Sequence, residues 1–229
     1  MKLYKFKGGG DALYTLDIAM NERLYCAKYR DLNDPFEGQF QTLINRNFLG
    51  GMPLNLAPLG GMPVPVTVFS AIEHLDELAD KPSRVCSLTT AWEDVRMWAL
   101  YGDSSRGVAF EFEVDESHPN LHRVEYLDGL PQIGIGLLSN PAIEEVLGRK
   151  TKHWEYEKEW RFISADEYVD VKGKLTRVLI GNRAAESLKQ ALVNLTPAHA
   201  DVYMIELNHL GLRMELGERL RQRVSEKHA

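Results

Sequence analysis

Hydrophobic and polar positions change their period several times along this chain. Residues 3–7 alternate and stop at three consecutive glycines, which is typical of a strand that ends in a turn. Leu13, Leu16, Ala19 and Met20 then recur at helical spacing. The same reasoning predicts further strands around residues 23–27, 84–88, 107–114, 124–126, 154–163, 175–180 and 202–207, and helices around 70–79, 90–102, 141–149 and 184–195.

These elements follow one another without a regular strand–helix–strand rhythm. The chain contains neither Gly-x-Gly-x-x-Gly nor Gly-x-x-x-x-Gly-Lys-Ser/Thr, so a Rossmann or P-loop fold would lack its phosphate cradle. We therefore predict an α+β fold with a largely antiparallel sheet flanked by helices. Residues 212–215 could extend a last strand pairing, and we interpret the charged tail from Arg213 as a solvated end.

One segment interrupts the pattern, at about residues 48–66. It is apolar but rich in Gly, Met and Pro, and Gly-Gly-Met-Pro occurs at 50–53 and again at 60–63. Loops of this length are often functional, so the segment could be a flap over a pocket, and a variable surface insertion is an equal alternative. We predict a single domain over residues 1–229 with this loop as an insertion.

Composition excludes several classes of protein. The 229 residues are 44% hydrophobic and 26% charged, which is typical of a globular chain and not of a disordered one. The net charge of −6 disfavours a general nucleic-acid binder, because phosphate neutralisation supplies most of that affinity. Cys26 and Cys86 fit reduced core thiols better than a disulfide framework. With no apolar run of membrane-spanning length, we expect a soluble cytoplasmic protein without a membrane partner, and an effector exported without a cleaved signal would look the same.

Residues 154–163 are the most informative stretch for chemistry. A helix would scatter their aromatic residues around its surface, so a strand is favoured. Neighbouring carboxylates raise one another's pKa, which is common in active sites, but the same face could be solvated with Glu159 and Arg161 as a structural ion pair. A strand places on one face Trp154, Tyr156, Trp160 and Phe162, and on the other Glu155, Glu157, Glu159 and Arg161.

Two further segments carry candidate ligand-binding groups. Ser87 and Thr89 point to one side of their strand, just before a helix that the Thr90–Glu93 capping box predicts. Hydroxyls in this place suit a sugar or phosphate oxygen, although helix capping alone would also explain them. Asn33 and Asp34 lie in a turn before a proline, where they could bind a ligand or only cap the turn.

Metal and serine-hydrolase chemistry are poorly supported. The seven histidines are scattered and form neither HxxxH nor HExxH, so we expect no metal site. Ser104 and Ser105 lack the GxSxG pattern of a nucleophile elbow.

Several blocks of the chain, in order, resemble a bacterial family known as domain of unknown function 2971. Leu100 departs from the pattern, which would have His before the Tyr, and the 48–66 loop looks particular to this chain. The blocks that carry the resemblance are Leu3-Tyr4-Lys5, Leu24-Tyr25, residues 32–37, Cys86-Ser87-Leu88, residues 97–101, residues 107–110, then Lys152, Trp154, Glu157, Glu159, Trp160 and Arg161, and finally Ile180-Gly181.

A more distant similarity is to the ADP-ribosyltransferase superfamily. Those enzymes carry a basic or aromatic residue on a first strand, Ser-x-Ser/Thr on a second and Glu-x-Glu or a lone Glu on a late strand. The matching positions here are Tyr4 or Lys5, Ser87-Leu88-Thr89 and Glu157-Lys158-Glu159. The resemblance implies a split sheet and NAD as substrate, although position 4 holds neither Arg nor His.

The same resemblance implies roles for individual residues. Glu159 would stabilise the positive charge that develops on the ribose, and Glu157 would accept a proton from the nucleophile. Ser87 and Thr89 would hold the ribose. Trp98 or Tyr101 would stack on nicotinamide, and Arg161 or Lys5 would bind the pyrophosphate.

Three functional hypotheses follow from the sequence. The first is an NAD-consuming ADP-ribosyltransferase-like or NAD-glycohydrolase-like protein of bacterial stress or conflict, with a small nucleotide as ligand and an unidentified protein or nucleic-acid acceptor. The second is a non-catalytic binding or regulatory domain in which the Trp/Glu/Arg cluster is structural. The third is a hydrolase that uses paired carboxylates on a nucleotide or sugar.

Overall fold

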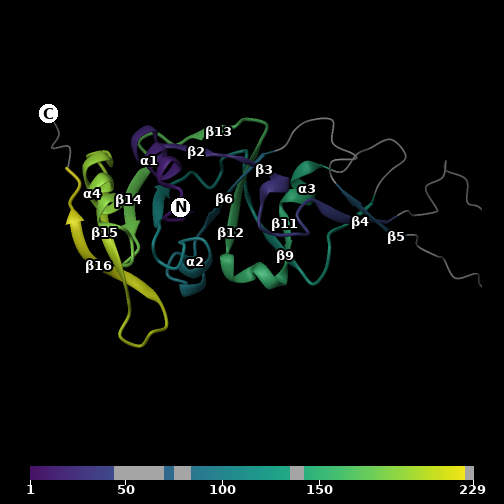
Figure 1. Cartoon of the computed structure of the whole chain (residues 1–229). Helices are drawn as coiled ribbons and strands as arrows, with labels where there is room; N and C mark the ends of the chain where they lie inside the picture. Colours follow the sequence, from purple (N-terminus) through teal and green to yellow (C-terminus); the bar gives the residue numbers. More distant parts are fainter. Residues whose placement is uncertain (44–69, 75–83, 135–141, 225–229) are drawn as a thin grey trace, which may run out of the picture.

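The computed structural model describes residues 1–43, 70–74, 84–134 and 142–224 (Figure 1). The Gly/Met/Pro-rich segment at 48–66, predicted to be a flap or an insertion, lies outside the described residues.

A long sheet forms the centre of the molecule, in the order β16-β15-β14-β7-β1-β6-β12-β8, with β3 paired to β6 beside this path. All neighbours pair antiparallel except β14 and β15, which are parallel. The predicted α+β class with a largely antiparallel sheet is therefore confirmed. The strands are β1 (Lys2–Lys7), β3 (Ala27–Lys28), β6 (Arg84–Thr89), β7 (Val108–Glu113), β8 (Leu121–Arg123), β12 (Glu159–Ser164), β14 (Leu175–Ile180), β15 (Asp201–Leu207) and β16 (Met214–Arg221).

Smaller strand groups and short helices surround this sheet. β13 pairs with β2, β11 with β9, and β4 lies between β10 and β5. The remaining strands are β2 (Arg23–Tyr25), β4 (Gln39–Leu43), β5 (Ser70–His74), β9 (Glu125–Leu127), β10 (Gln132–Gly134), β11 (Arg149–Thr151) and β13 (Tyr168–Asp170). The helices are α1 (Ala12–Asn21), α2 (Val95–Leu100), α3 (Ile143–Leu147) and α4 (Glu186–Leu195), with 3₁₀ turns η1 (Tyr29–Asp31) and η4 (Lys152–Glu157).

The central sheet opens between β1 and β6. These strands share a single register pair, Tyr4 with Thr89. By contrast β1 pairs with β7 from Lys2 to Lys7, and β6 pairs with β12 along its whole length. Each half is thus continuous, and the two halves separate beyond Tyr4, which leaves space between them.

Both faces of the sheet are covered. The strand predicted around residues 107–114 is confirmed as β7, and on one of its faces Phe110 and Phe112 lie in the main core with helices α1 and α4 packed over it (Figure 1). On the other face Glu111 is fully buried. It accepts hydrogen bonds from the Tyr4 hydroxyl at 2.5 Å and the Thr176 hydroxyl at 2.6 Å, so its charge is satisfied internally.

The strand predicted over residues 154–163 is correct only in its second half. Residues 152–157 form the 3₁₀ turn η4, and Lys158 has φ of 44° in the left-handed region, where a side chain is rarely accommodated. This residue turns the chain before β12 begins at Glu159. Trp154 and Tyr156 therefore do not share a strand face with Trp160.

Two helix predictions were wrong in part. Residues 70–74 form strand β5, because they pair with β4. The helix expected from Thr90 begins only at Val95, since the preceding residues form a turn and the Asp94 carboxylate caps the helix by accepting from the Arg96 N–H at 2.8 Å.

The tail from Arg213 was wrongly interpreted as a solvated end. Residues 214–221 form β16, which pairs with β15. The charges are accommodated because the arginines find partners at the sheet edge. Arg219 donates to the Tyr203 hydroxyl at 2.7 Å, and Arg221 donates to backbone carbonyls that follow α4, including Thr196 O at 2.6 Å.

The two cysteines are free and buried, as predicted. The register Ala27 with Val85 between β3 and β6 places Cys26 beside Cys86, although they are far apart in sequence. They pack into the main core with Leu88 and Phe162.

Candidate functional site

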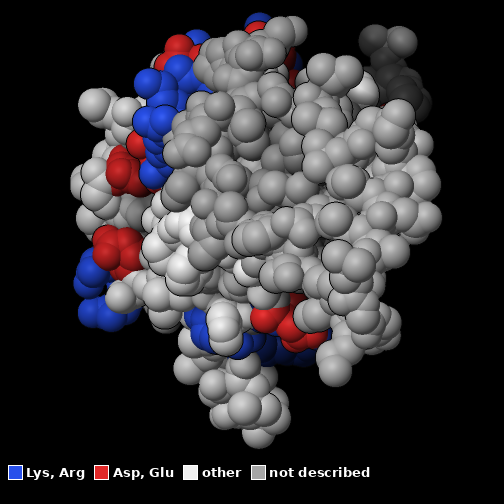
Figure 2. All heavy atoms as spheres, turned by 90° about the vertical axis from the view of Figure 1, so that its right-hand side faces the viewer, with Lys and Arg blue, Asp and Glu red and all other residues white. Residues whose placement is uncertain are grey.

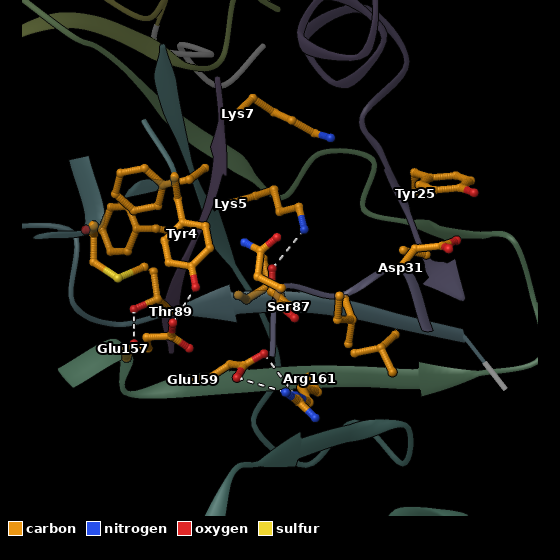
Figure 3. A pocket seen from close by; sticks show the side chains of 18 of the residues that line it. Tyr4, Lys5, Lys7, Tyr25, Asp31, Ser87, Thr89, Glu157, Glu159 and Arg161 are labelled. Carbon is orange, nitrogen blue, oxygen red and sulfur yellow. Dashed lines mark hydrogen bonds and ion pairs between the residues drawn. The ribbon is translucent and has the colours of Figure 1, made fainter. Parts of the chain in front are cut away.

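A cavity of about 440 Å³ lies where β1 and β6 separate (Figure 3). This volume is in the range of small-molecule sites. The cavity gathers side chains from distant parts of the sequence. The predicted site residues that line it are Tyr4, Lys5, Asn33, Ser87, Thr89, Tyr101, Glu157, Glu159 and Arg161.

Two predicted site residues do not line the cavity. Trp98 is fully buried and packs edge-to-face with Phe6, with ring centroids 4.9 Å apart, and its Nε1–H donates to Trp92 O at 2.7 Å. It cannot stack on a ligand from this position. Asp34 is also buried, and its carboxylate accepts from the Phe36 N–H at 2.9 Å, so it fixes the turn rather than a ligand.

The strand register aligns the predicted residues of three strands in one row. Tyr4 on β1 is opposite Thr89 on β6, and Thr89 is opposite Glu159 on β12. Ser87 is opposite Arg161 in the same β6–β12 ladder. Because cross-strand neighbours point to the same side of a sheet, the hydroxyls of β6 and the carboxylate of β12 face the same space.

Glu159 lies at the buried end of the cavity between two cations. Its carboxylate accepts from Arg161 Nε at 2.9 Å and from Lys150 Nζ at 3.2 Å, and the nearby Ser87 hydroxyl also favours its charged form. Burial by itself would raise the pKa of Glu159, but the charges of Arg161 and Lys150 outweigh this cost and lower it to about 2. Glu159 is therefore a fixed anion at neutral pH.

Every N–H group of the Arg161 guanidinium has a hydrogen-bond acceptor within the protein. It makes a two-pronged ion pair with Glu37 at 2.7 and 2.8 Å, binds Glu159 through Nε and Nη2, and donates to Leu147 O at 2.6 Å. A guanidinium has five N–H groups, and these contacts use them all. Arg161 thus holds Glu159 in place and has no donor left for the pyrophosphate that the sequence assigned to it.

Glu157 has the opposite electrostatic character. It ends η4 rather than lying on the strand of Glu159, but its carboxylate still reaches the cavity, 2.7 Å from Lys150 Nζ, and accepts from the Tyr101 hydroxyl. Burial raises its pKa above the ordinary value, and Lys150 offsets only part of that shift. The Thr89 hydroxyl donates to Glu157 O and so ties this residue to β6.

Several lining residues were missed by the sequence reasoning. Lys150 comes from β11 and bridges Glu157 and Glu159, yet no local pattern marks it. Glu37 belongs to the 32–37 block that carries the family resemblance, so the block pointed to it without giving its role. The outer part of the cavity is lined by Lys7, Asp11, Tyr14, Tyr25 and Asp31.

Ionisation of Glu159 and ionisation of Glu157 are expected to have opposite effects on the stability of the fold. Because the pKa of Glu159 is depressed, its ionised form stabilises the fold above pH about 4.5, by about 3 kcal/mol, and this contribution disappears as pH falls to about 2. Because the pKa of Glu157 is raised, its ionisation costs stability at neutral pH. We expect Glu159→Gln to lower the free energy of unfolding at pH 7 far more than Glu157→Gln.

Urea unfolding at pH 7, 5 and 3 measures this contrast. The difference between wild type and Glu159→Gln should shrink steadily towards pH 2, whereas Glu157→Gln should show no such loss on acidification. Equal losses for the two variants at every pH would show that their pKa values are not separated.

Figure 2, which views the side of β4 and β5, shows cationic and anionic side chains lying next to one another among the described residues of that face. In the same described part of the chain, no group of three His, Cys, Asp or Glu side chains is placed to hold a metal ion. None of the helices in the described ranges is long and apolar enough to cross a membrane.

Comparisons with protein-family models, with curated proteins and with solved structures found no match. The family resemblances drawn from the sequence therefore stay predictions, and the function has to be argued from the cavity itself.

Proposed function

We propose that this protein cleaves the nicotinamide–ribose bond of NAD, as an ADP-ribosyltransferase-like or NAD-glycohydrolase-like enzyme. One observation supports this most. The first-strand residue Tyr4, the hydroxyl-bearing segment of Ser87 and Thr89, and Glu159 come from three neighbouring strands and line one cavity. The resemblance to that superfamily requires this order of motifs, and nothing in their spacing along the sequence requires them to meet.

The chemistry follows from the charge of Glu159. When the bond between ribose C1′ and the nicotinamide nitrogen breaks, the electron pair leaves with nicotinamide, and positive charge develops on the sugar. A carboxylate that stays ionised stabilises this charge more than it stabilises the neutral ribose, which lowers the barrier. The contacts from Arg161 and Lys150 hold this carboxylate in one orientation.

Glu157 is suited to the second half of the reaction. A nucleophile, either water or an acceptor hydroxyl, forms the new bond to C1′ and loses a proton. The raised pKa of Glu157 makes it a better proton acceptor than Glu159, because general bases work best when their pKa is closer to the ambient pH. Protonated Glu157 would then release the proton to solvent.

The residues proposed to bind the nicotinamide and the pyrophosphate differ in part from those expected from the sequence. Trp98 is buried, so of the two aromatic residues considered only Tyr101 is left to stack on nicotinamide. Arg161 has no free donor, so the pyrophosphate falls to Lys5, whose Nζ lies 3.0 Å from Ser87 O at the cavity wall. An ammonium can bind a phosphate oxygen while it keeps this backbone contact, since it has three donors.

A second function is favoured by one specific observation. Glu159 and Arg161 form a closed pair whose side chains are only 4% and 1% exposed, which is also what a purely structural ion pair looks like. In that case the cavity would bind a small ligand without transforming it, and the carboxylates would serve the fold.

Incubation with NAD separates the two functions. The enzyme is expected to release nicotinamide, with either free ADP-ribose or ADP-ribose linked to protein as the second product, and the second product decides between hydrolase and transferase. NAD that binds but stays intact over many hours would favour the non-catalytic function. Nicotinamide release at equal rates in wild type and Glu159→Gln would remove Glu159 from its proposed role.

A further inference from the structure

The cavity has two halves of different chemistry, and the proposed bond cleavage takes place in the buried one. The outer half is lined by Lys5, Lys7, Tyr14, Tyr25 and Asp31. Figure 3 shows Lys5 and Lys7 extending from β1 towards the side on which Tyr25 and Asp31 lie.

Two lysines give this half its cationic wall. Lys5 and Lys7 are two positions apart on β1, so their side chains leave the strand on the same side. Both are half-buried. Burial and the neighbouring charge of Lys5 lower the pKa of Lys7, which means that the charged form of Lys7 carries a cost in the absence of a ligand. A bound anion such as a diphosphate would remove that cost.

An aromatic wall lies beside the lysines, with Lys7 Nζ placed over the Tyr14 ring, 5.0 Å from its centroid. The rings of Tyr14 and Tyr25 have centroids 6.2 Å apart and are inclined by 39°. Tyr25 is held from behind by the edge of Tyr168, at 5.6 Å, and by Arg84 near its hydroxyl. Tyr14 is 52% exposed. An exposed aromatic ring of this kind is well suited to stack on a planar ring of a ligand. Stacking on such a wall adds affinity for any nucleobase, because every base has a π-face.

Carboxylates complete the outer half. Asp31, the last residue of η1, lines the cavity. Asp11, which precedes α1, also lines it and lies close enough to Lys7 to interact with its charge. A carboxylate beside a bound nucleoside accepts hydrogen bonds from ribose hydroxyls and repels a phosphate on the same sugar.

We propose that the outer half binds the adenosine diphosphate end of the dinucleotide, with the diphosphate on Lys5 and Lys7 and the adenine on Tyr14 and Tyr25, and that Asp31 and Asp11 make the site selective for NAD over NADP. This proposal deepens the proposed function and rests on it for the identity of the whole substrate. The adenosine subsite itself needs no cleavage of NAD.

Calorimetric titration with ADP tests the subsite without any reaction. Lys7→Gln removes a charged partner of the diphosphate, and Tyr25→Leu removes the stacking face. Each change is expected to weaken ADP binding about tenfold. Lys28→Gln is the matched control, because it removes one positive charge from an exposed position outside the cavity, and it should bind ADP like the wild type.

Titration with NAD and NADP tests the selectivity, with Glu159→Gln as background so that the substrate stays intact. NAD should bind at least about tenfold more tightly than NADP, and Asp31→Asn should reduce this ratio about fivefold by relieving the repulsion of the 2′-phosphate. Equal affinity for NAD and NADP in the presence of Asp31 would overturn the selectivity.

The outcomes separate this proposal from the proposed function. If ADP binds and depends on Lys7 and Tyr25 while NAD stays intact, the subsite is supported and the enzymatic function fails. If NAD is cleaved but ADP binding is unchanged in Lys7→Gln and Tyr25→Leu, the function stands and the subsite is overturned. Absence of ADP binding to the wild type also overturns the subsite.

Discussion

Glu159→Gln is expected to slow nicotinamide release by roughly 10²–10³-fold, the range found when a single preorganised electrostatic group is removed from an active site. The substitution removes the charge while it nearly keeps the shape. The loss should appear in kcat more than in KM, because the interaction strengthens only as positive charge develops on the ribose.

Glu37→Gln is the matched control for this prediction. Glu37 and Glu159 both bind the Arg161 guanidinium, and their side chains are equally buried at 4% exposure. A structural effect transmitted through Arg161 should therefore appear in both variants. We expect Glu37→Gln to lower stability but to keep turnover within about tenfold of the wild type. Parallel losses of kcat in the two variants would contradict a direct role for Glu159.

Strands were predictable where burial made their pattern local. Residues 175–180 form β14 as predicted, because this segment begins and ends with apolar residues that are buried in the core. Residues 84–88 and 3–7 likewise fall within β6 and β1. The tail from Arg213 was mistaken for solvated chain because its arginines find partners only after β15 and α4 have folded beside it.

The candidate site was predictable in its strand-borne members and not in their partners. Ser87 and Thr89 on β6, and Glu159 and Arg161 on β12, follow two-residue spacings, which place the two side chains of each pair on the same face of their strand. Glu37 and Arg161 are 124 positions apart and meet only through the tertiary fold. The role of Lys150 could not be predicted either, since a single lysine in a short strand belongs to no periodic pattern.

The break at Lys158 could not be read from the sequence either. A left-handed residue is usually a glycine or asparagine, so a lysine gives no warning of a turn. As a result the alternation from 154 to 163 was taken as one strand. The two carboxylates of Glu157 and Glu159 nevertheless lie close together, because the 3₁₀ turn returns Glu157 to Lys150, which also binds Glu159.

Arg161→Leu is expected to lower the free energy of unfolding by about 3–5 kcal/mol, the cost of leaving buried charges without their partner. Arg161 is 1% exposed, and its removal leaves Glu37 and Glu159 facing one another with Lys150 alone to compensate. The Leu147 carbonyl loses its donor as well. Arg161→Lys should restore only part of the loss, because an ammonium cannot reproduce the two-pronged contact with Glu37.

A double-mutant cycle with Glu37→Gln identifies the cause of that loss. In the wild-type background Glu37→Gln removes half of an ion pair and should destabilise the protein, whereas in the Arg161→Leu background it removes an uncompensated charge and should restore stability. Acid should also reduce the cost of Arg161→Leu, because protonation of the two carboxylates relieves their repulsion. The difference in free energy of unfolding between Arg161→Leu and the wild type should therefore be smaller at pH 4 than at pH 7. If Glu37→Gln destabilises both backgrounds equally, Arg161 contributes through packing of its side chain and not through the buried ion network.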